Sequence, residues 1–129
     1  MRIYLLRHEK RYLDSNNFDV DLTPDGFECS KKLVDILEDL NIDIVYSSPY
    51  KRVIQTIEPY LIKSNKKINI EYGLYESLTN DIDESNIRKI NTELYGYNYI
   101  NKYYKSFIDI NYLEPGENYE EIKFRSRNF

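Results

Sequence analysis

Short apolar runs of β-prone residues alternate with capped helical segments along the first 73 residues, and this alternation limits the possible folds more than any other feature. Strands are predicted at residues 3–6, 42–46 and 68–72, and the helices that separate them at about residues 24–40 and 49–61. Strands alternating with helices are typical of a parallel sheet, because each helix returns the chain to the end where the next strand starts. The sequence therefore predicts an α/β fold, with a mainly parallel sheet and flanking helices.

The helix starts are marked by capping residues followed by proline. Thr23-Pro24 and Ser48-Pro49 both place a side-chain oxygen before a proline, an arrangement that favours the first turn of a helix. Pro59 should kink or interrupt the second helix, since a proline inside a helix removes a backbone hydrogen bond. Further along, Asn118 and Glu121 have the spacing of a capping box, which predicts a last helix beginning there.

The length of 129 residues corresponds to one domain, predicted to span residues 1–129. Residues 80–111 interrupt the alternation and are predicted to form a helical insertion, with helices around Glu84–Tyr95 and Asn98–Ile108. The longest apolar run, Ile3–Leu6, is far shorter than the roughly 18 residues that span a bilayer. Because the N-terminus also lacks the pattern of a signal or transit peptide, we expect a cytoplasmic protein with no membrane partner.

Charge and residue counts exclude several kinds of site. The net charge of −4 argues against a nucleic-acid partner, which usually requires a basic face. One cysteine cannot form an intramolecular disulfide, and one histidine with one cysteine cannot assemble a zinc site of nitrogen and sulfur ligands. The four glycines do not have the spacing of a nucleotide phosphate loop. Carboxylates are thus the only candidate metal ligands.

Four charged or titratable residues follow the predicted strands. Arg7 and His8 follow the first strand, Arg52 lies in the helix after the second, and Glu76 follows the third. Ligands bind beyond the carboxyl ends of parallel strands, so these side chains are expected to meet at one rim of the sheet. Arginine is the best donor to a phosphate dianion, and neutral imidazole is a nucleophile near neutral pH. With a carboxyl group to protonate the departing oxygen, the set predicts phosphoryl-transfer chemistry.

Five short motifs that contain these residues occur in the order known from one protein family. They are Leu6-Arg7-His8, Leu22-Thr23-Pro24-Asp25-Gly26, Tyr46 to Thr56, Leu74-Tyr75-Glu76, and Pro115-Gly116-Glu117-Asn118 with the later Arg125. By this set, which covers essentially the whole chain, the sequence resembles the histidine phosphatase superfamily, also called phosphoglycerate mutase-like. The most specific of the five is the segment from Tyr46 to Thr56, with its serine-serine-proline, arginine and glutamine-threonine residues.

The resemblance implies a phosphoglycerate mutase-like fold and the activity of a histidine acid phosphatase, the hydrolysis of phosphomonoesters. It implies that His8 forms a phosphohistidine intermediate, that Arg7 and Arg52 bind the phosphoryl group, and that Glu76 acts first as acid and then as base. The substrate would be a phosphorylated small molecule or a phosphoprotein, and no metal or cofactor would be required.

Two departures from the family pattern leave alternatives open. Glu9 stands where the family has a glycine, and the second histidine, which in the family follows a later strand, is absent because His8 is the only histidine. The resemblance thus implies a C-terminally truncated domain that lacks its C-terminal strand or strands. Three interpretations follow: a phosphatase with weakened or lost activity, a noncatalytic phosphoanion-binding remnant, or a structural domain. Sheet edges left open by the missing strand also predict a homodimer formed through them.

Overall fold

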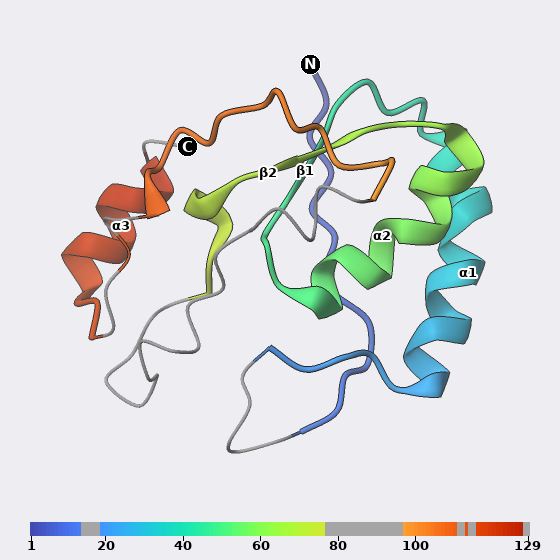
Figure 1. The fold of residues 1–129 in the computed structure, drawn as a ribbon, viewed down its shortest axis with the longest axis horizontal. Coiled ribbons are helices and arrows are strands. Elements are labelled where there is room, and N and C mark those ends of the chain that lie inside the picture. Colours follow the sequence, from blue (N-terminus) through green and yellow to red (C-terminus); the bar gives the residue numbers. More distant parts are fainter. Residues whose placement is uncertain (14–18, 77–96, 111–112, 114–115, 128–129) are drawn as a thin grey trace.

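The computed structural model describes residues 1–13, 19–76, 97–110, 113 and 116–127. Its elements are α1 (Pro24–Asp39), β1 (Val45–Ser47), α2 (Lys51–Ser64), β2 (Ile68–Ile70), the 3-10 helix η1 (Tyr72–Leu74) and α3 (Tyr119–Arg127). The strands pair in parallel, with Val45 opposite Ile68 and Ser47 opposite Ile70. Helices α1 and α2 lie together at one end of the molecule, and α3 lies at the other (Figure 1). In the described part of the chain, no helix is long and apolar enough to cross a membrane.

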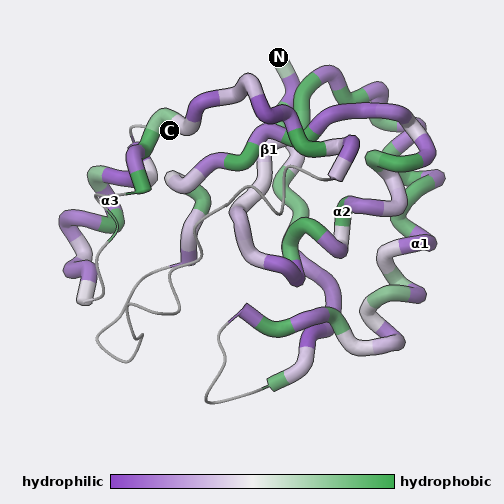
Figure 2. The backbone as a smooth tube through the Cα atoms, in the orientation of Figure 1, coloured by the Kyte–Doolittle hydropathy of each residue, from purple (hydrophilic) through white to green (hydrophobic). Residues whose placement is uncertain are grey.

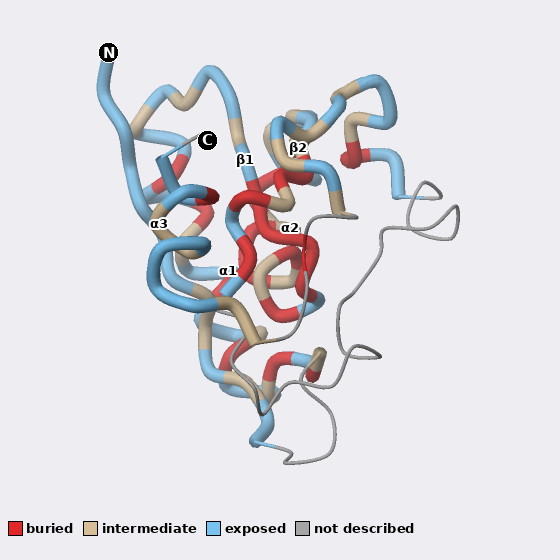
Figure 3. Tube along the Cα trace, turned by 90° about the vertical axis from the view of Figure 1, so that its left-hand side faces the viewer, coloured by how far each residue is buried: buried red, intermediate tan, exposed pale blue. Residues whose placement is uncertain are grey.

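The main core lies between α1, α2 and β2. Its buried side chains come from all three elements and from the segment around Ile100, and they are Val34, Leu37, Ile54, Ile57, Tyr60, Leu61, Ile68, Ile70, Tyr99 and Ile100. Hydrophobic residues alternate with hydrophilic ones along both helices, so each helix turns one apolar side to this core (Figure 2). Figure 3 shows the buried residues concentrated on α2 and the neighbouring strands.

Helix α1 begins where the sequence predicts. Thr23 is the N-cap, and its Oγ1 accepts a hydrogen bond from the Gly26 N–H at 3.2 Å. A side chain at residue 26 would not fit, because a Cβ at this position would lie only 2.2 Å from the carbonyl oxygen of Lys10. The absence of a side chain at residue 26 therefore lets the segment after His8 lie directly against the first turn of α1.

Helix α2 begins two residues later than the proline signal predicts, so the expected capping role of Ser48 is wrong. Tyr50 is the N-cap, and the Lys51 N–H is satisfied by Oδ1 of Asp19 at 2.8 Å, a carboxylate from a distant loop. The expected interruption at Pro59 is also wrong, because the helix continues to Ser64. Buried residues on both sides of the proline hold it in the core, and tertiary packing of this kind stabilises most protein helices.

The N-terminal run Ile3–Leu6 is not a strand, which corrects the first strand prediction. Ile3 is 73% exposed and Leu5 is 94% exposed, and the run lies along the surface (Figure 3). A strand requires a hydrogen-bonded neighbour, yet in the described residues β1 pairs only with β2. Without that neighbour, β propensity alone does not form a strand.

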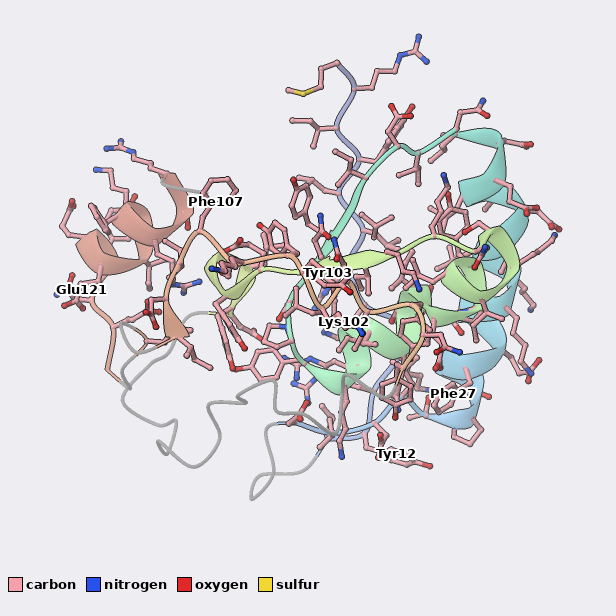
Figure 4. All side chains as sticks on the ribbon, turned by 45° about the horizontal axis from the view of Figure 1, so that its top comes forward. Tyr12, Phe27, Lys102, Tyr103, Phe107 and Glu121 are labelled. Carbon is pink, nitrogen blue, oxygen red and sulfur yellow. The ribbon has the colours of Figure 1, made fainter. Side chains whose placement is uncertain are left out.

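Residues 97–110 are described, and the helix expected at Asn98–Ile108 is not present in them. Ile100 instead forms a parallel bridge with Ile68 of β2, with hydrogen bonds from the Ile68 N–H to the Tyr99 carbonyl at 2.8 Å and from the Asn101 N–H to the Ile68 carbonyl at 2.9 Å. The free edge of β2 thus offers backbone partners that outweigh local helix propensity. The segment continues across the molecule toward α3, where Phe107 lies (Figure 4). The helix expected at Glu84–Tyr95 lies outside the described residues.

Glu71, directly after β2, is a fully buried carboxylate that binds this segment. It accepts hydrogen bonds from the hydroxyls of Tyr104 at 2.7 Å and Ser106 at 2.6 Å, and from the N–H groups of Gly73 at 2.8 Å and Phe107 at 2.9 Å. Burial alone raises the pKa of Glu71, but these four hydrogen bonds outweigh it and hold the pKa below its ordinary value. The charged form of Glu71 is therefore part of the folded structure.

Replacing Glu71 with glutamine should reduce stability in a pH-dependent way. Because the folded-state pKa is lowered, the charged carboxylate contributes stability that is present above its unfolded pKa of about 4.3 and lost as pH falls through the folded value. We expect Glu71→Gln to lower the free energy of unfolding by about 2–3 kcal/mol at pH 7, and by progressively less in acid. Urea unfolding between pH 3 and 7 measures the difference. Glu120→Gln, at an exposed position of α3, is the control, and a deficit that stays constant across this range would contradict the linkage.

Candidate active site

Arg52, in the first turn of α2, is the buried cation at the centre of the site. Its side chain is 1% exposed, and Nη2 donates to Oε2 of Glu76 at 2.9 Å. The guanidinium also lies over the ring of Tyr50, with 4.3 Å between Cζ and the ring centroid. The ion pair and the stacking together fix the orientation of a side chain whose full charge lies out of water.

The charges around Arg52 favour an anion. Burial lowers the pKa of Arg52, the Glu76 carboxylate opposes this shift, and the nearby positive charge of Arg11 adds to it. Arginine still keeps its proton at physiological pH, because its ordinary pKa is above 12. The buried guanidinium of Arg52 thus lies within the electrostatic influence of a second, partly exposed cation, and an anion that reaches it is attracted by both charges.

His8 is half-buried and has one ring nitrogen engaged. Nδ1 lies 2.7 Å from the backbone carbonyl oxygen of Glu9. A carbonyl oxygen only accepts, so Nδ1 carries the proton in this hydrogen bond, and Nε2 of the neutral ring retains its lone pair. Nε2 is therefore the nitrogen of His8 that can attack an electrophile.

A threonine hydroxyl joins the His8 turn to α2. The Glu9 N–H donates to Oγ1 of Thr56 at 3.0 Å, and the same hydroxyl donates to the carbonyl of Arg52 at 2.7 Å. Thr56 follows Arg52 by four residues and so lies one turn further along the same face of the helix. The backbone beside His8 is thereby attached to the helical turn that carries Arg52.

The chain after His8 is held in place from two sides. The Thr23 N–H donates to the Lys10 carbonyl at 2.9 Å, and an antiparallel bridge joins Arg11 with Leu22. From α2, the side-chain oxygen of Gln55 accepts from the Leu22 N–H at 2.9 Å. The His8 turn, the start of α1 and the first turns of α2 are therefore connected by one set of hydrogen bonds.

Glu76 belongs to the turn that follows β2. Within this turn, the Leu74 N–H donates to the Glu71 carbonyl and the Tyr75 N–H to the Tyr72 carbonyl, each at 3.1 Å. The Glu76 side chain is 56% exposed, although one of its oxygens contacts Arg52. A carboxyl group in this position can exchange protons with water and also reach a molecule bound at Arg52.

Among the described residues, no hydrogen bond or ion pair joins Arg7 to Arg52, Glu76 or the His8 ring. Arg7 is exposed. Arg11 is instead the arginine whose positive charge helps to lower the pKa of Arg52. A role of Arg7 in binding a phosphoryl group stays a prediction.

Sequence reasoning assigned no role at the site to Tyr50 or Thr56. The spacing of four residues between Arg52 and Thr56 was a usable signal, since it places both on one helix face. The stacking of Tyr50 on Arg52 had no such signal, because residues two positions apart do not normally face each other on a helix. No group of histidine, cysteine, aspartate or glutamate side chains in the described residues could hold a metal ion.

Comparisons with known proteins identify the family and the fold. The family model of the histidine phosphatase superfamily (branch 1) matches residues 3–129. Among solved structures, the ecdysone phosphate phosphatase EPPase from Bombix mori, in complex with tungstate, is similar with a TM-score of 0.62 and 20% sequence identity. The similarity covers 85% of this chain and 44% of that one, so this chain spans less than half the length of EPPase. No curated protein matches the sequence.

The structural match confirms the predicted fold class, a phosphoglycerate mutase-like arrangement of a parallel sheet with helices. The family model covers nearly every residue, including all five motifs around His8, Arg52 and Glu76. The chain belongs to the histidine phosphatase superfamily.

Proposed function

We propose that this chain hydrolyses phosphomonoesters through a phosphohistidine intermediate on His8. The observation that carries the proposal is the juxtaposition of a buried guanidinium, Arg52, with the carboxylate of Glu76 and with the turn that bears His8. Family membership and the likeness to a phosphatase support the same class of activity. Tungstate in the EPPase structure is a tetrahedral oxyanion like phosphate, which supports an oxyanion site in this fold.

In the first step, Nε2 of His8 attacks phosphorus and the bond to the ester oxygen breaks. The protonated carboxyl group of Glu76 gives its proton to the departing alkoxide, so an alcohol leaves and Glu76 becomes a carboxylate. Arg52 binds the phosphoryl oxygens, with Arg7 as the second predicted donor, and stabilises their charge in the transition state.

In the second step, the Glu76 carboxylate takes a proton from water while the water oxygen attacks phosphorus. The nitrogen–phosphorus bond breaks, which releases inorganic phosphate and returns His8 to its neutral form. The half-exposed position of Glu76 supports this role, because water has access to its carboxylate. The proposed substrate is a phosphorylated small molecule or a phosphoprotein, with no metal or cofactor.

A second candidate is a noncatalytic site that binds a phosphoanion. The buried guanidinium of Arg52 favours it, since a buried cation can bind an anion without any turnover. Phosphate release from a generic phosphomonoester separates hydrolysis from binding alone, and vanadate binding separates both from a structural domain.

We further propose a homodimer formed through open sheet edges. In the described residues β1 has a strand partner on one side only, and apolar side chains are exposed at Ile44, directly before β1, and at Leu5 in the N-terminal run. An open strand edge is a template for pairing with another chain, and buried apolar area would add to the stability of the pair.

The variant His8→Ala should abolish phosphate release while leaving secondary structure unchanged. His8 is proposed as the nucleophile and is only half-buried, so its loss should lower turnover by roughly a thousandfold or more without unfolding the chain. Phosphate release and circular dichroism measure the two effects. Cys29→Ala, at an exposed position of α1, is the matched control, and activity retained in His8→Ala would exclude the phosphohistidine mechanism.

The variant Arg52→Ala should weaken vanadate binding by at least about tenfold, or roughly 1.4 kcal/mol, because a charge-assisted contact is lost. Calorimetric titration measures the affinity, and circular dichroism verifies the fold. Arg127→Ala, which removes an exposed arginine of α3, should change the vanadate affinity little. Equal losses in both variants would mean that binding is diffuse electrostatics.

In sedimentation experiments, the wild-type chain should form a dimer that Leu5→Lys or Ile44→Lys dissociates. A lysine near the open edge places a charge where an apolar surface would be buried, which should raise the dimer dissociation constant at least about tenfold. Ile62→Lys, at an exposed position on α2, is the control and should leave the dimer intact. A wild-type monomer with a cooperative melt above about 60 °C would contradict the proposal.

A further inference from the structure

Arg125 of α3 has a buried guanidinium in which every N–H group is engaged. Nε and Nη2 donate to the two carboxylate oxygens of Glu117 at 2.7 and 2.8 Å. Nη1 donates to the carbonyls of Gly73 at 2.9 Å and Tyr75 at 2.8 Å, and Nη2 also donates to the carbonyl of Glu76 at 3.4 Å. A guanidinium has five N–H donors, so these five contacts use all of them.

The three carbonyls belong to the turn that presents Glu76 to Arg52. Arg125 therefore contacts the backbone of Glu76, while the side chain of the same residue pairs with Arg52 at 2.9 Å. The turn is held from the other side as well, since the buried carboxylate of Glu71 accepts from the Gly73 N–H at 2.8 Å. The N–H and the carbonyl of Gly73 are thus bound by two buried side chains of opposite charge.

The Arg125–Glu117 pair orients the guanidinium that joins α3 to the turn. Its two side chains are only 5% and 7% exposed, and taking such a pair out of water is costly. Apolar packing could join the two elements without that cost. What apolar packing could not provide is a directional contact to three carbonyls at once, because only a planar fork of donors has that geometry.

We propose that Arg125, oriented by Glu117, is a positioning residue for the Glu76 carboxyl group, so that α3 is a functional part of the site. The inference rests on the proposed acid–base role of Glu76. Arg125 touches no reacting atom and acts only through the backbone of the turn.

This role has a chemical signature. An ester with a good leaving group, such as p-nitrophenyl phosphate, needs little help from an acid, whereas an alkyl phosphate such as glycerol phosphate depends on it. Misplacing Glu76 should therefore slow the alkyl ester far more than the aryl ester. Anion binding at Arg52 should change much less than tenfold, because α2 and the ring of Tyr50 still hold the guanidinium when its contact with Glu76 is disturbed.

The test uses the full chain with Arg125→Lys, which keeps the charge but loses the fork, and Glu117→Gln, which is a milder change. Arg127→Lys, two residues further along α3, is the matched control. Amide hydrogen exchange should become at least tenfold faster at Leu74 and Tyr75, whose N–H groups close the turn, with little change in α1 and α2. The ratio of kcat/KM for the aryl ester to that for the alkyl ester should rise at least tenfold.

Unchanged exchange at Leu74 and Tyr75 in both variants would overturn the proposal, as would faster exchange with an unchanged ester ratio. Faster exchange that also extends over α1 and α2 would mean that Arg125 stabilises the whole fold. That result would overturn the proposal too. If the wild-type chain releases phosphate from neither ester, the proposed hydrolysis fails separately. The exchange data, together with a vanadate affinity that changes by much less than tenfold in Arg125→Lys, then still decide whether Arg125 fixes the turn beside Arg52.

Discussion

A buried guanidinium must find an acceptor for each donor and a partner for its charge, and this requirement shapes the centre of the molecule. Arg52 and Arg125 come from helices at opposite ends of the fold, yet both contact the turn after β2. One binds the carboxylate of Glu76, and the other binds the backbone. In the described residues, the sheet of β1 and β2 contributes to the site because β2 leads directly into this turn, which lies between the two cations.

The sequence allowed correct prediction of the elements whose signals are local. Helix α1 begins at its threonine-proline pair, and Asn118 and Glu121 form the predicted capping box, with the Asn118 N–H donating to Glu121 at 2.8 Å and the Glu121 N–H to Asn118 at 3.1 Å. The expectation that side chains beyond the carboxyl ends of parallel strands meet at one rim also predicted the proximity of Arg52 and Glu76.

The features that could not be predicted depend on partners far away in the chain. Whether Ile3–Leu6 forms a strand is decided by a neighbour, not by its own β propensity. A helix was expected at residues 98–108, but the open edge of β2 and the carboxylate of Glu71 supply hydrogen-bond partners that a helix there could not reach. The same holds at the start of α2, where Asp19 satisfies an N–H that local reasoning had assigned to Ser48.

The contact between Arg125 and the turn joins residues 49 to 52 positions apart, and this has a consequence for the order of events during synthesis. At about 5–20 residues per second, a ribosome needs roughly 2–10 seconds to extend the chain from the turn to α3. Both strands and α2 have been made by then, and Arg52 can already meet Glu76. The nascent protein thus passes through a period in which its core can be packed while the turn beside Arg52 still lacks its hydrogen bonds from Arg125.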